Sequence, residues 1–336
     1  MDPIIKVDDI AYPTLQVPDL ALQEKFLIDF GMKRVGLTDD TLYMRGEGPQ
    51  PFIHVTRLGE KKFVSNAFYA CSMLDLEKIS GEAAFSDVEE LTSPGGGYVT
   101  RATDCDGLGV EVVFGIQERE TDDDLSPIEV NVGGVSREHF RRINQIKRFP
   151  KGGYPRIKRY GHCGLNAIDP QASLDWYNHH LGIIATDLLM PGGEGGPLMG
   201  IFARCDRGEQ PADHHTLFWL PAPMLSEGIP GLNHVAYEMV NIDDVFMGHE
   251  ILVREGYELE WGIGRHYQGS QIFDYWRSPF NHTHEHQIDG DVFDNSTPPQ
   301  IIDVLQDGDP SRPEDGPPSQ WGPSLNVASF GDKKGF

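Results

Sequence analysis

Apolar residues recur at helical spacing in two widely separated stretches of the chain, and each stretch follows a short run that alternates like a strand. The apolar positions of the two stretches are Leu22, Phe26, Phe30, Leu174, Tyr177 and Leu181. An aspartate suited to an N-cap precedes each stretch, Asp19 or Asp169, and a glycine follows it, Gly31 or Gly182. The pattern predicts two strand–helix units placed alike in two halves of the chain.

The repeat continues beyond these helices. The segment "SNAFYACSMLDLEKI" from Ser65 resembles "LNHVAYEMVNIDDVF" from Leu232, and "DCDGLGVEVVFG" from Asp104 resembles "SPFNHTHEHQID" from Ser278. Each half therefore contains two strand–helix–strands units. We expect an N-terminal domain over residues 1–135 and a C-terminal domain over 156–294, joined by the polar, charged segment at roughly 116–155. The Pro- and Gly-rich segment 295–336 is too poor in apolar residues for a core of its own and is expected to pack on the body.

Composition narrows the class of protein. The chain has 336 residues, 39% of them hydrophobic and 24% charged, which suits a globular enzyme. A formal net charge of −24 disfavours nucleic acid and anionic membranes as partners, because both reward a basic surface. The four cysteines form no CxxC motif, and no apolar run is long enough to span a membrane. We expect a cytoplasmic protein.

The second half carries metal-capable side chains at places where the first half mostly lacks them. In the second half these residues are His162, His234 and Glu285, and the residues aligned with them are Tyr12, either Ala67 or Phe68, and Glu111. A single strand histidine is more often a hydrogen-bonded side chain than a ligand. The gain of the whole set in one repeat indicates a metal site. Two histidines and one carboxylate are the composition of the facial triad of non-haem Fe(II) enzymes, and Mn(II) accepts the same ligands.

The spacing of these residues excludes a local metal motif. His162 and His234 are 72 residues apart, and Glu285 follows 51 residues later, so the ligands come from different strands. Neither a zinc finger nor a helical HExxH site has such spacing.

The stretch "NHTHEHQIDG" at 281–290 looks at first like a local metal cluster. Strand alternation puts His282, His284 and His286 on one face and Glu285 on the other. We therefore expect the three histidines to pack, to form hydrogen bonds or to face solvent. If the strand is bulged, His284 and His286 instead support the ligands.

At these residues the sequence resembles the vicinal oxygen chelate superfamily and, within it, the type I extradiol ring-cleaving dioxygenases. The motifs that carry the resemblance are "YGHCGLNAIDP", "ADHHTLFW", "GLNHVAYEM" and "GRHYQGSQIFDYWRSPFNHTHE". Two positions depart from the family signature: Ser278 replaces the usual Asp before Pro, and Asn281 replaces the usual Gly after it. Because Asn tolerates left-handed backbone, we expect the turn to be kept.

The resemblance implies an α+β fold of four βαβββ modules in two domains, with metal only in the C-terminal domain. It implies Fe(II) held by His162, His234 and Glu285, a catecholic substrate cleaved with O2, and a homo-oligomer. His215 would be the acid/base residue, and His266 and Tyr275 would line the site and bind substrate or oxygen-derived species. We expect His214 and His215 to be adjacent on a strand and so to point to opposite faces, which means that only one of them can enter the site; the resemblance selects His215.

Two other functions remain open from the sequence. One is another enzyme of the superfamily, a glyoxalase-like isomerase or a thiol transferase, and the other is a non-catalytic binding protein. The glycine-rich insertion 190–200 has no counterpart in the first half. It either shapes the substrate pocket or is a plain surface loop.

Overall fold

The computed structural model describes residues 2–121, 131, 140–144, 146, 153–304 and 319–323. Most of the predicted linker and most of the C-terminal segment lie outside these residues, so the domain limits stay predictions. Within the described residues, no helix combines the length and the apolar character needed to cross a membrane.

The strands and helices of the two halves follow one another in similar order. The first half contains β1 (Val7–Val17), α1 (Leu20–Asp29), β2 (Lys33–Leu37), β3 (Thr41–Arg45), β4 (His54–Leu58), β5 (Lys62–Ala70), α2 (Met73–Ser80), β6 (Glu89–Glu90), β7 (Tyr98–Thr103) and β8 (Gly109–Phe114). The second half contains β9 (Ile157–Ala167), α3 (Pro170–Leu181), β10 (Ile183–Leu189), β11 (Gly200–Cys205), β12 (Ala212–Asp213), β13 (Leu217–Pro221), α4 (Ala222–Leu225), β14 (Gly231–Met239), α5 (Ile242–Glu255), β15 (Glu258–His266), β16 (Ile272–Arg277), β17 (Thr283–Ile288) and β18 (Val292–Phe293). Two short strands follow, β19 (Gln300–Ile302) and β20 (Ser319–Trp321).

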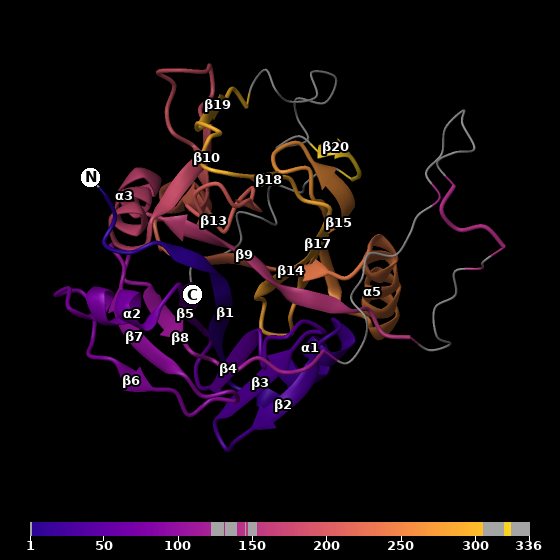
Figure 1. Ribbon diagram of the computed structural model, residues 1–336. Helices are drawn as coiled ribbons and strands as arrows, with labels where there is room; N and C mark the ends of the chain where they lie inside the picture. The colour runs from indigo at the N-terminus through magenta and orange to yellow at the C-terminus, as the bar shows by residue number, and fades with distance from the viewer. Residues whose placement is uncertain are drawn as a thin grey trace.

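Each half forms one mixed sheet, and the strand order of the two sheets is the same (Figure 1). The first sheet runs β2-β3-β4-β1-β5-β8-β7-β6, and the second runs β10-β11-β13-β9-β14-β17-β16-β15 between the added edge strands β19 and β20. Each βαβββ module thus contributes four neighbouring strands to its sheet. The predicted α+β fold of four modules is confirmed.

Helices α1 and α3 begin at the capping aspartates that the sequence pattern predicted, and α3 ends at the predicted glycine. Asp19 caps α1 by accepting a hydrogen bond from the Leu22 backbone N–H, and Asp169 caps α3 in the same way. Gly182 ends α3 with φ +70°, a left-handed conformation that glycine adopts without strain. The predicted caps are confirmed.

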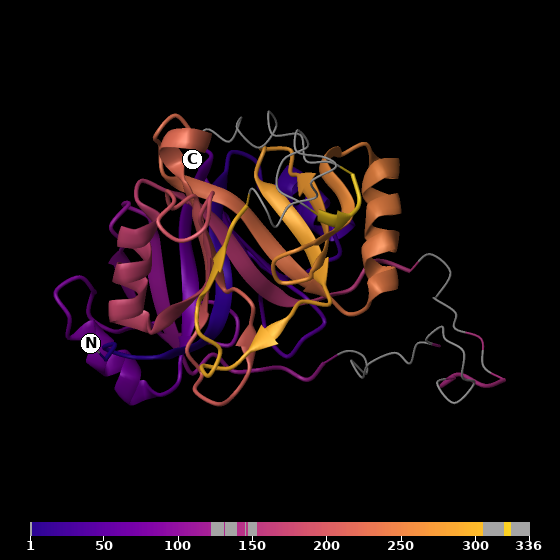
Figure 2. The same ribbon diagram turned by 90° about the horizontal axis from the view of Figure 1, so that it is seen from above.

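Helices α3 and α5 pack at opposite ends of the second sheet (Figure 2). Helix α3 packs on β10, β11 and β13, and α5 packs on β14 to β17. The strands that lie between these ends are β9, β14 and β17, and their inner face is where the chemistry gathers.

The two halves are joined by buried polar contacts as well as by apolar packing. His54 Nδ1 lies 2.6 Å from the Tyr237 hydroxyl, and the Tyr160 hydroxyl donates to Asn66 Oδ1 over 2.8 Å. These groups are buried on both sides, so separating the halves would leave polar atoms without partners. The relative placement of the two sheets is therefore specific.

Two described segments of the C-terminal region extend the second sheet at its edges. Strand β19 pairs in parallel with β10, and β20 pairs antiparallel with β15. The insertion 190–200 lies between β10 and β11, and its hydrogen bonds run to this region: Met190 N–H donates to Ile302 O over 2.9 Å, and Gly192 N–H donates to Asp303 Oδ1 over 2.8 Å. These contacts anchor one end of the insertion at the sheet edge.

Candidate metal centre

Three neighbouring strands bring His162, His234 and Glu285 together. His162 lies on β9, His234 on β14 and Glu285 on β17, and β14 is paired with both of the other strands. Ala236 on β14 pairs with His162 on one side and with Glu285 on the other. Because paired residues and residues two apart share one face of a sheet, all three side chains point the same way. Their ligand atoms lie within 4.8 Å of one another.

The donor set fits a divalent cation. His162 Nε2 lies 3.1 Å from His234 Nε2, and Glu285 Oε2 lies 3.1 Å and 3.5 Å from these nitrogens. All three residues are buried, and among the described residues no hydrogen bond of full geometry satisfies either Glu285 oxygen. Burial acts to raise the pKa of the Glu285 carboxyl, but His162 and His266 beside it outweigh burial and hold that pKa well below its usual range. A buried carboxylate without donors is costly, and a bound cation removes that cost.

Asn233 fixes the orientation of one of these histidines. His234 Nδ1 lies 2.9 Å from Asn233 Oδ1, and an amide oxygen can only accept. The proton of neutral His234 therefore sits on Nδ1, and the lone pair of Nε2 points toward Glu285. Such a partner orients a metal-binding histidine in the way that outer-shell groups do. No pattern in the sequence set Asn233 apart.

The first half shows what the same backbone holds without these histidines. Tyr12 pairs with Ala67 and Ala67 with Glu111, which is the register of His162, Ala236 and Glu285. Two residues before Ala67 on β5 stands Ser65, so Ser65 is the counterpart of His234. The expectation that Ala67 or Phe68 occupies this place was wrong, because the strand register pairs Ser65 with Thr14 as it pairs His234 with Gly164.

Hydrogen-bond donors satisfy Glu111 in the first half. The Tyr12 hydroxyl donates to Glu111 Oε2 over 3.0 Å, and the Ser65 hydroxyl donates to Oε1 over 3.1 Å. Arg101 Nε, on the strand position that Tyr275 takes in the second half, lies 3.7 Å from the same carboxylate. Protein donors thus do for Glu111 what a cation would do for Glu285.

Gly164 makes room for a ligand and went unnoticed in the sequence. It pairs with His234, and a Cβ added at Gly164 would lie 2.5 Å from both Cε1 and Nδ1 of that ring. In the first half the corresponding pair is Thr14 and Ser65. A small serine tolerates a side chain opposite it, whereas the imidazole of His234 requires glycine.

Three further residues from the sequence prediction surround the ligand set. The rings of His215 and His162 have their centroids 4.2 Å apart. His266 Nε2 lies 3.1 Å from the Tyr275 hydroxyl and 3.8 Å from Glu285 Oε1. Burial and the nearby charge of Glu285 raise the pKa of Tyr275, so its phenol stays protonated. Burial, together with His162 and His214, holds the pKa of His215 well below its usual value, so its imidazole is neutral.

His214 and His215 are not on a strand, which corrects the argument from alternation. They lie in the bend between β12 and β13, and both are buried. Their Nδ1 atoms lie 2.9 Å apart, and their rings stand at 89°. A bend frees neighbouring side chains from pointing to opposite faces, so these two touch each other.

The histidines of "NHTHEHQIDG" lie on the face opposite Glu285, as alternation predicts. His284 packs edge-on against Phe26, with ring centroids 5.0 Å apart. His286 stacks on Phe30 at 3.8 Å, and its Nε2 lies 2.7 Å from Phe30 O. This face of β17 packs on α1 of the first half, so these side chains serve the contact between the halves. Asn281 has φ +62°, which confirms the left-handed turn.

A cavity of about 240 Å³ reaches His162 and His215. Polar side chains form much of its wall. Its other lining residues are Lys158, Arg159, Asp213, Glu238, Gln271, Gln287, Asp289, Gly290, Asp291 and Val292. A larger cavity of about 600 Å³ lies in the first half beside Asp9 and Tyr69, and none of the three candidate ligands lines it.

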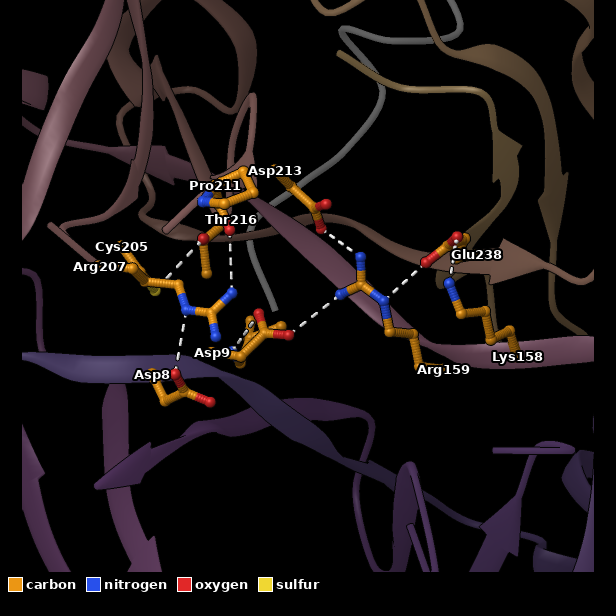
Figure 3. Close-up of polar contacts among 11 residues, drawn as sticks. Asp8, Asp9, Lys158, Arg159, Cys205, Arg207, Pro211, Asp213, Thr216 and Glu238 are labelled. Atoms are coloured by element: carbon orange, nitrogen blue, oxygen red, sulfur yellow. Dashed lines mark hydrogen bonds and ion pairs between the residues drawn. The ribbon is translucent and has the colours of Figure 1, made fainter. Parts of the chain in front are cut away.

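Arg159 organises the charged wall of the smaller cavity (Figure 3). Its guanidinium lies 3.1 Å from Asp9 of the first half and 2.6 Å from Glu238, and it also contacts Asp213. Asp213 directly precedes the two histidines of the bend. This network ties the first half to the loop that carries His215, and it compensates the charge of Arg159 with carboxylates.

Comparison with known protein families finds a match in the second half of the chain. Residues 159–285 match the Glyoxalase/Bleomycin resistance protein/Dioxygenase superfamily. The three candidate ligands all lie within these residues.

Two curated relatives are similar in sequence. Metapyrocatechase 2 of Cupriavidus necator is 26% identical over 287 residues, which is 85% of this chain and 82% of that protein. An iron-dependent extradiol dioxygenase of Rhodococcus jostii (strain RHA1) is 28% identical over 154 residues, 44% of this chain and 47% of that protein. These relatives confirm the resemblance to extradiol dioxygenases that the motifs indicated.

Solved structures share the fold. An extradiol ring-cleaving dioxygenase from B. fuscum matches with a TM-score of 0.75 at 17% identity, over 98% of this chain and 83% of that one. The Mn(II)-bound glyoxalase from Novosphingobium aromaticivorans matches with a TM-score of 0.73 at 23% identity, over 98% and 94%. At these identities the likeness establishes the fold, and the chemistry has to be argued from the site.

Proposed function

We propose that the protein is an extradiol dioxygenase: it cleaves the ring of a catechol beside the two hydroxyl groups and incorporates both atoms of O2. The observation that carries the proposal is the buried set of two imidazole nitrogens and one carboxylate. No hydrogen bond of full geometry satisfies that carboxylate. His162, His234 and Glu285 would hold Fe(II), and Mn(II) fits the same ligands. The first half, with its satisfied Glu111, would bind no metal.

The bound cation would act as a Lewis acid that lowers the pKa of a coordinated phenol and accepts both the catechol and dioxygen as ligands. Side chains of the protein would move the proton and bind the substrate oxygen. His215, neutral and buried beside His162, would take a phenolic proton and return it to the product. Tyr275, which keeps its proton, would donate a hydrogen bond to substrate oxygen, with His266 as its partner.

The relatives support this reading, since one is named a metapyrocatechase and another an iron-dependent extradiol dioxygenase. We further propose action in the cytoplasm, a role in the breakdown of aromatic compounds and assembly as a homo-oligomer. The four cysteines are free thiols, which agrees with a reducing compartment. Sedimentation of the purified protein measures the oligomer.

The test is anaerobic reconstitution with Fe(II), addition of a panel of catechols and admission of air. We expect oxygen uptake and a yellow ring-opened product from at least one catechol. The metal-free protein and the His162→Ala variant are the matched controls and should show neither. If no catechol consumes oxygen and a thiol adduct of a 2-oxoaldehyde is isomerised instead, the protein is a glyoxalase-like enzyme.

A further inference from the structure

A chain of three buried side chains ends at His215. His215 Nδ1 lies 2.9 Å from His214 Nδ1, and His214 Nε2 lies 2.9 Å from Asp187 Oδ2. Asp187 lies on β10, whereas the histidines lie in the bend before β13. Asp187, His214 and His215 are 5%, 3% and 4% exposed, respectively, so water does not compete for these contacts.

The chemistry of the three groups sets the direction of both hydrogen bonds. An ionised carboxylate only accepts, so the proton of His214 sits on Nε2 and points to Asp187. In a neutral His214, Nδ1 then carries only a lone pair, and His215 donates its Nδ1–H to it. A neutral imidazole that donates from Nδ1 carries its lone pair on the other nitrogen, Nε2. Nε2 lies on the ring edge opposite the His214 contact.

We propose that Asp187 and His214 are positioning residues that hold His215 in the tautomer whose Nε2 accepts the proton of the substrate. The inference rests on the proposed function, in which His215 moves that proton. When His215 gains the proton on Nε2, its Nδ1–H continues to donate to His214, and the Asp187 carboxylate stabilises the added positive charge through that ring. A wrong histidine tautomer is known to be costly where a buried carboxylate normally fixes it.

Packing holds the chain of side chains in place. The Phe202 ring contacts both histidines, with centroids 5.4 Å from His214 and 4.8 Å from His215. The backbone N–H of His214 donates to Asp291 O over 2.8 Å. The pair is therefore fixed by its surroundings as well as by its own hydrogen bonds.

The first half carries none of these three polar side chains at the equivalent places. Strand pairing aligns β10 with β2 and β13 with β4. Successive cross-strand partners in the second sheet are Asp187, Phe202, Phe218 and Gly164, and the matching partners in the first sheet are Gly36, Tyr43, Val55 and Thr14. The residues that take the places of Asp187, His214 and His215 are Gly36, Pro51 and Phe52. Phe52 packs on Tyr12 at 4.7 Å, as His215 packs on His162. The half without metal ligands keeps the packing and lacks all three polar groups.

The tautomer can be read directly by 15N NMR of histidine-labelled, metal-free, full-length protein. The His215 signals are assigned as those missing from the spectrum of His215→Asn. We expect a protonated Nδ1 and an unprotonated Nε2 for His215 in the wild type. In Asp187→Ala and His214→Leu we expect a mixture of tautomers, whereas His214→Gln, whose amide oxygen can accept the same hydrogen bond, should restore the wild-type pattern.

Asp274→Asn is the matched control. It also removes a buried carboxylate from a histidine, His249, but this histidine does not belong to the hydrogen-bonded series Asp187–His214–His215. It should leave the His215 tautomer unchanged. A wild-type His215 that is protonated on Nε2 overturns the proposal, as does a His214→Leu spectrum that matches the wild type. Should Asp187→Ala fail to fold, the wild-type and His214→Leu spectra still decide.

Turnover provides the second readout. In the iron-loaded enzyme, Asp187→Ala should lower kcat for a catechol about tenfold to a hundredfold with KM within about twofold, since part of a general acid–base contribution is lost. An unchanged kcat contradicts the positioning role. If no catechol is cleaved by the wild type but the NMR pattern is as expected, the proposed function fails while the hydrogen-bond chain stands.

Discussion

Glu111 and Glu285 occupy equivalent positions in the two sheets, opposite Ala67 and Ala236 respectively. The first accepts hydrogen bonds from Tyr12 and Ser65, and the second faces two imidazole nitrogens without a donor. The fold therefore supplies a buried carboxylate twice, and the neighbouring residues decide what neutralises it. This internal contrast lets the first half serve as the control for experiments on the second.

Removal of either histidine ligand should abolish metal retention. We expect His162→Ala and His234→Ala to lower affinity for Fe(II) by more than about 100-fold, beyond what the loss of an outer-shell partner costs. Tyr12→Ala, at the position equivalent to His162, should bind iron like the wild type. Iron content after anaerobic loading and desalting measures the effect, and full occupancy in His234→Ala would contradict the ligand assignment.

Gly164→Ala should weaken metal binding without touching a ligand. The added methyl would lie 2.5 Å from the His234 ring, so the ring must move, and overpacking of this kind costs about 1–3 kcal/mol. We expect metal affinity to fall about tenfold or more in a titration with Mn(II).

Gly161→Ala is the matched control on the same strand. Its methyl meets the terminal Nε2 of Gln287 at 2.7 Å, and a flexible amide can swing away. We expect its metal affinity to stay within about twofold of the wild type. Equal affinity of Gly164→Ala and the wild type would show that His234 does not need this space.

His215→Ala should keep iron and turn over slowly. The residue lies beside His162 but offers no atom to the ligand set, so metal content should be unchanged. General acid–base catalysis contributes about 10²–10⁴-fold, and kcat should fall by that order. Stopped-flow absorbance of the ring-opened product gives the rate. A variant as fast as the wild type removes the catalytic role of His215.

The repeat made the fold and the ligand set predictable from sequence. Two copies of the same pattern exposed the caps of α1 and α3, and the copies differ most visibly where His162 stands in place of Tyr12. Strand alternation placed Glu285 on the face opposite its neighbouring histidines. These are properties of local backbone geometry, and local sequence carries them.

The rest depends on geometry that no local pattern records. The alignment of His234 with Ser65 requires knowledge of the strand register, and the contact between His214 and His215 requires knowledge of a bend. Asp187 and Gly164 are ordinary residues in sequence. Their roles follow from the imidazole rings beside them, His214 for Asp187 and His234 for Gly164, and tertiary structure determines these contacts.

His249 and Asp274 give the stability of the C-terminal half a dependence on pH. His249 Nδ1 on α5 lies 3.0 Å from Asp274 Oδ1 on β16, and Asp274 directly precedes Tyr275. The hydrogen bond to Asp274 raises the pKa of His249 above its usual value, although burial opposes it. A histidine whose pKa is raised by folding contributes stability that is fully present below its unfolded pKa of about 6.5 and lost as pH rises through the folded pKa.

His249→Gln removes that contribution. In urea unfolding of the metal-free protein, the free energy of unfolding of the wild type should exceed that of the variant by about 1 kcal/mol more at pH 5.5 than at pH 9, the net size of a typical hydrogen bond in a folded protein. Metal must be absent from both samples, because a ligand that binds only the folded state would add its own pH dependence. A difference between the two proteins that stays constant from pH 5.5 to 9 would mean that protonation of His249 does not support the packing of α5 on the sheet.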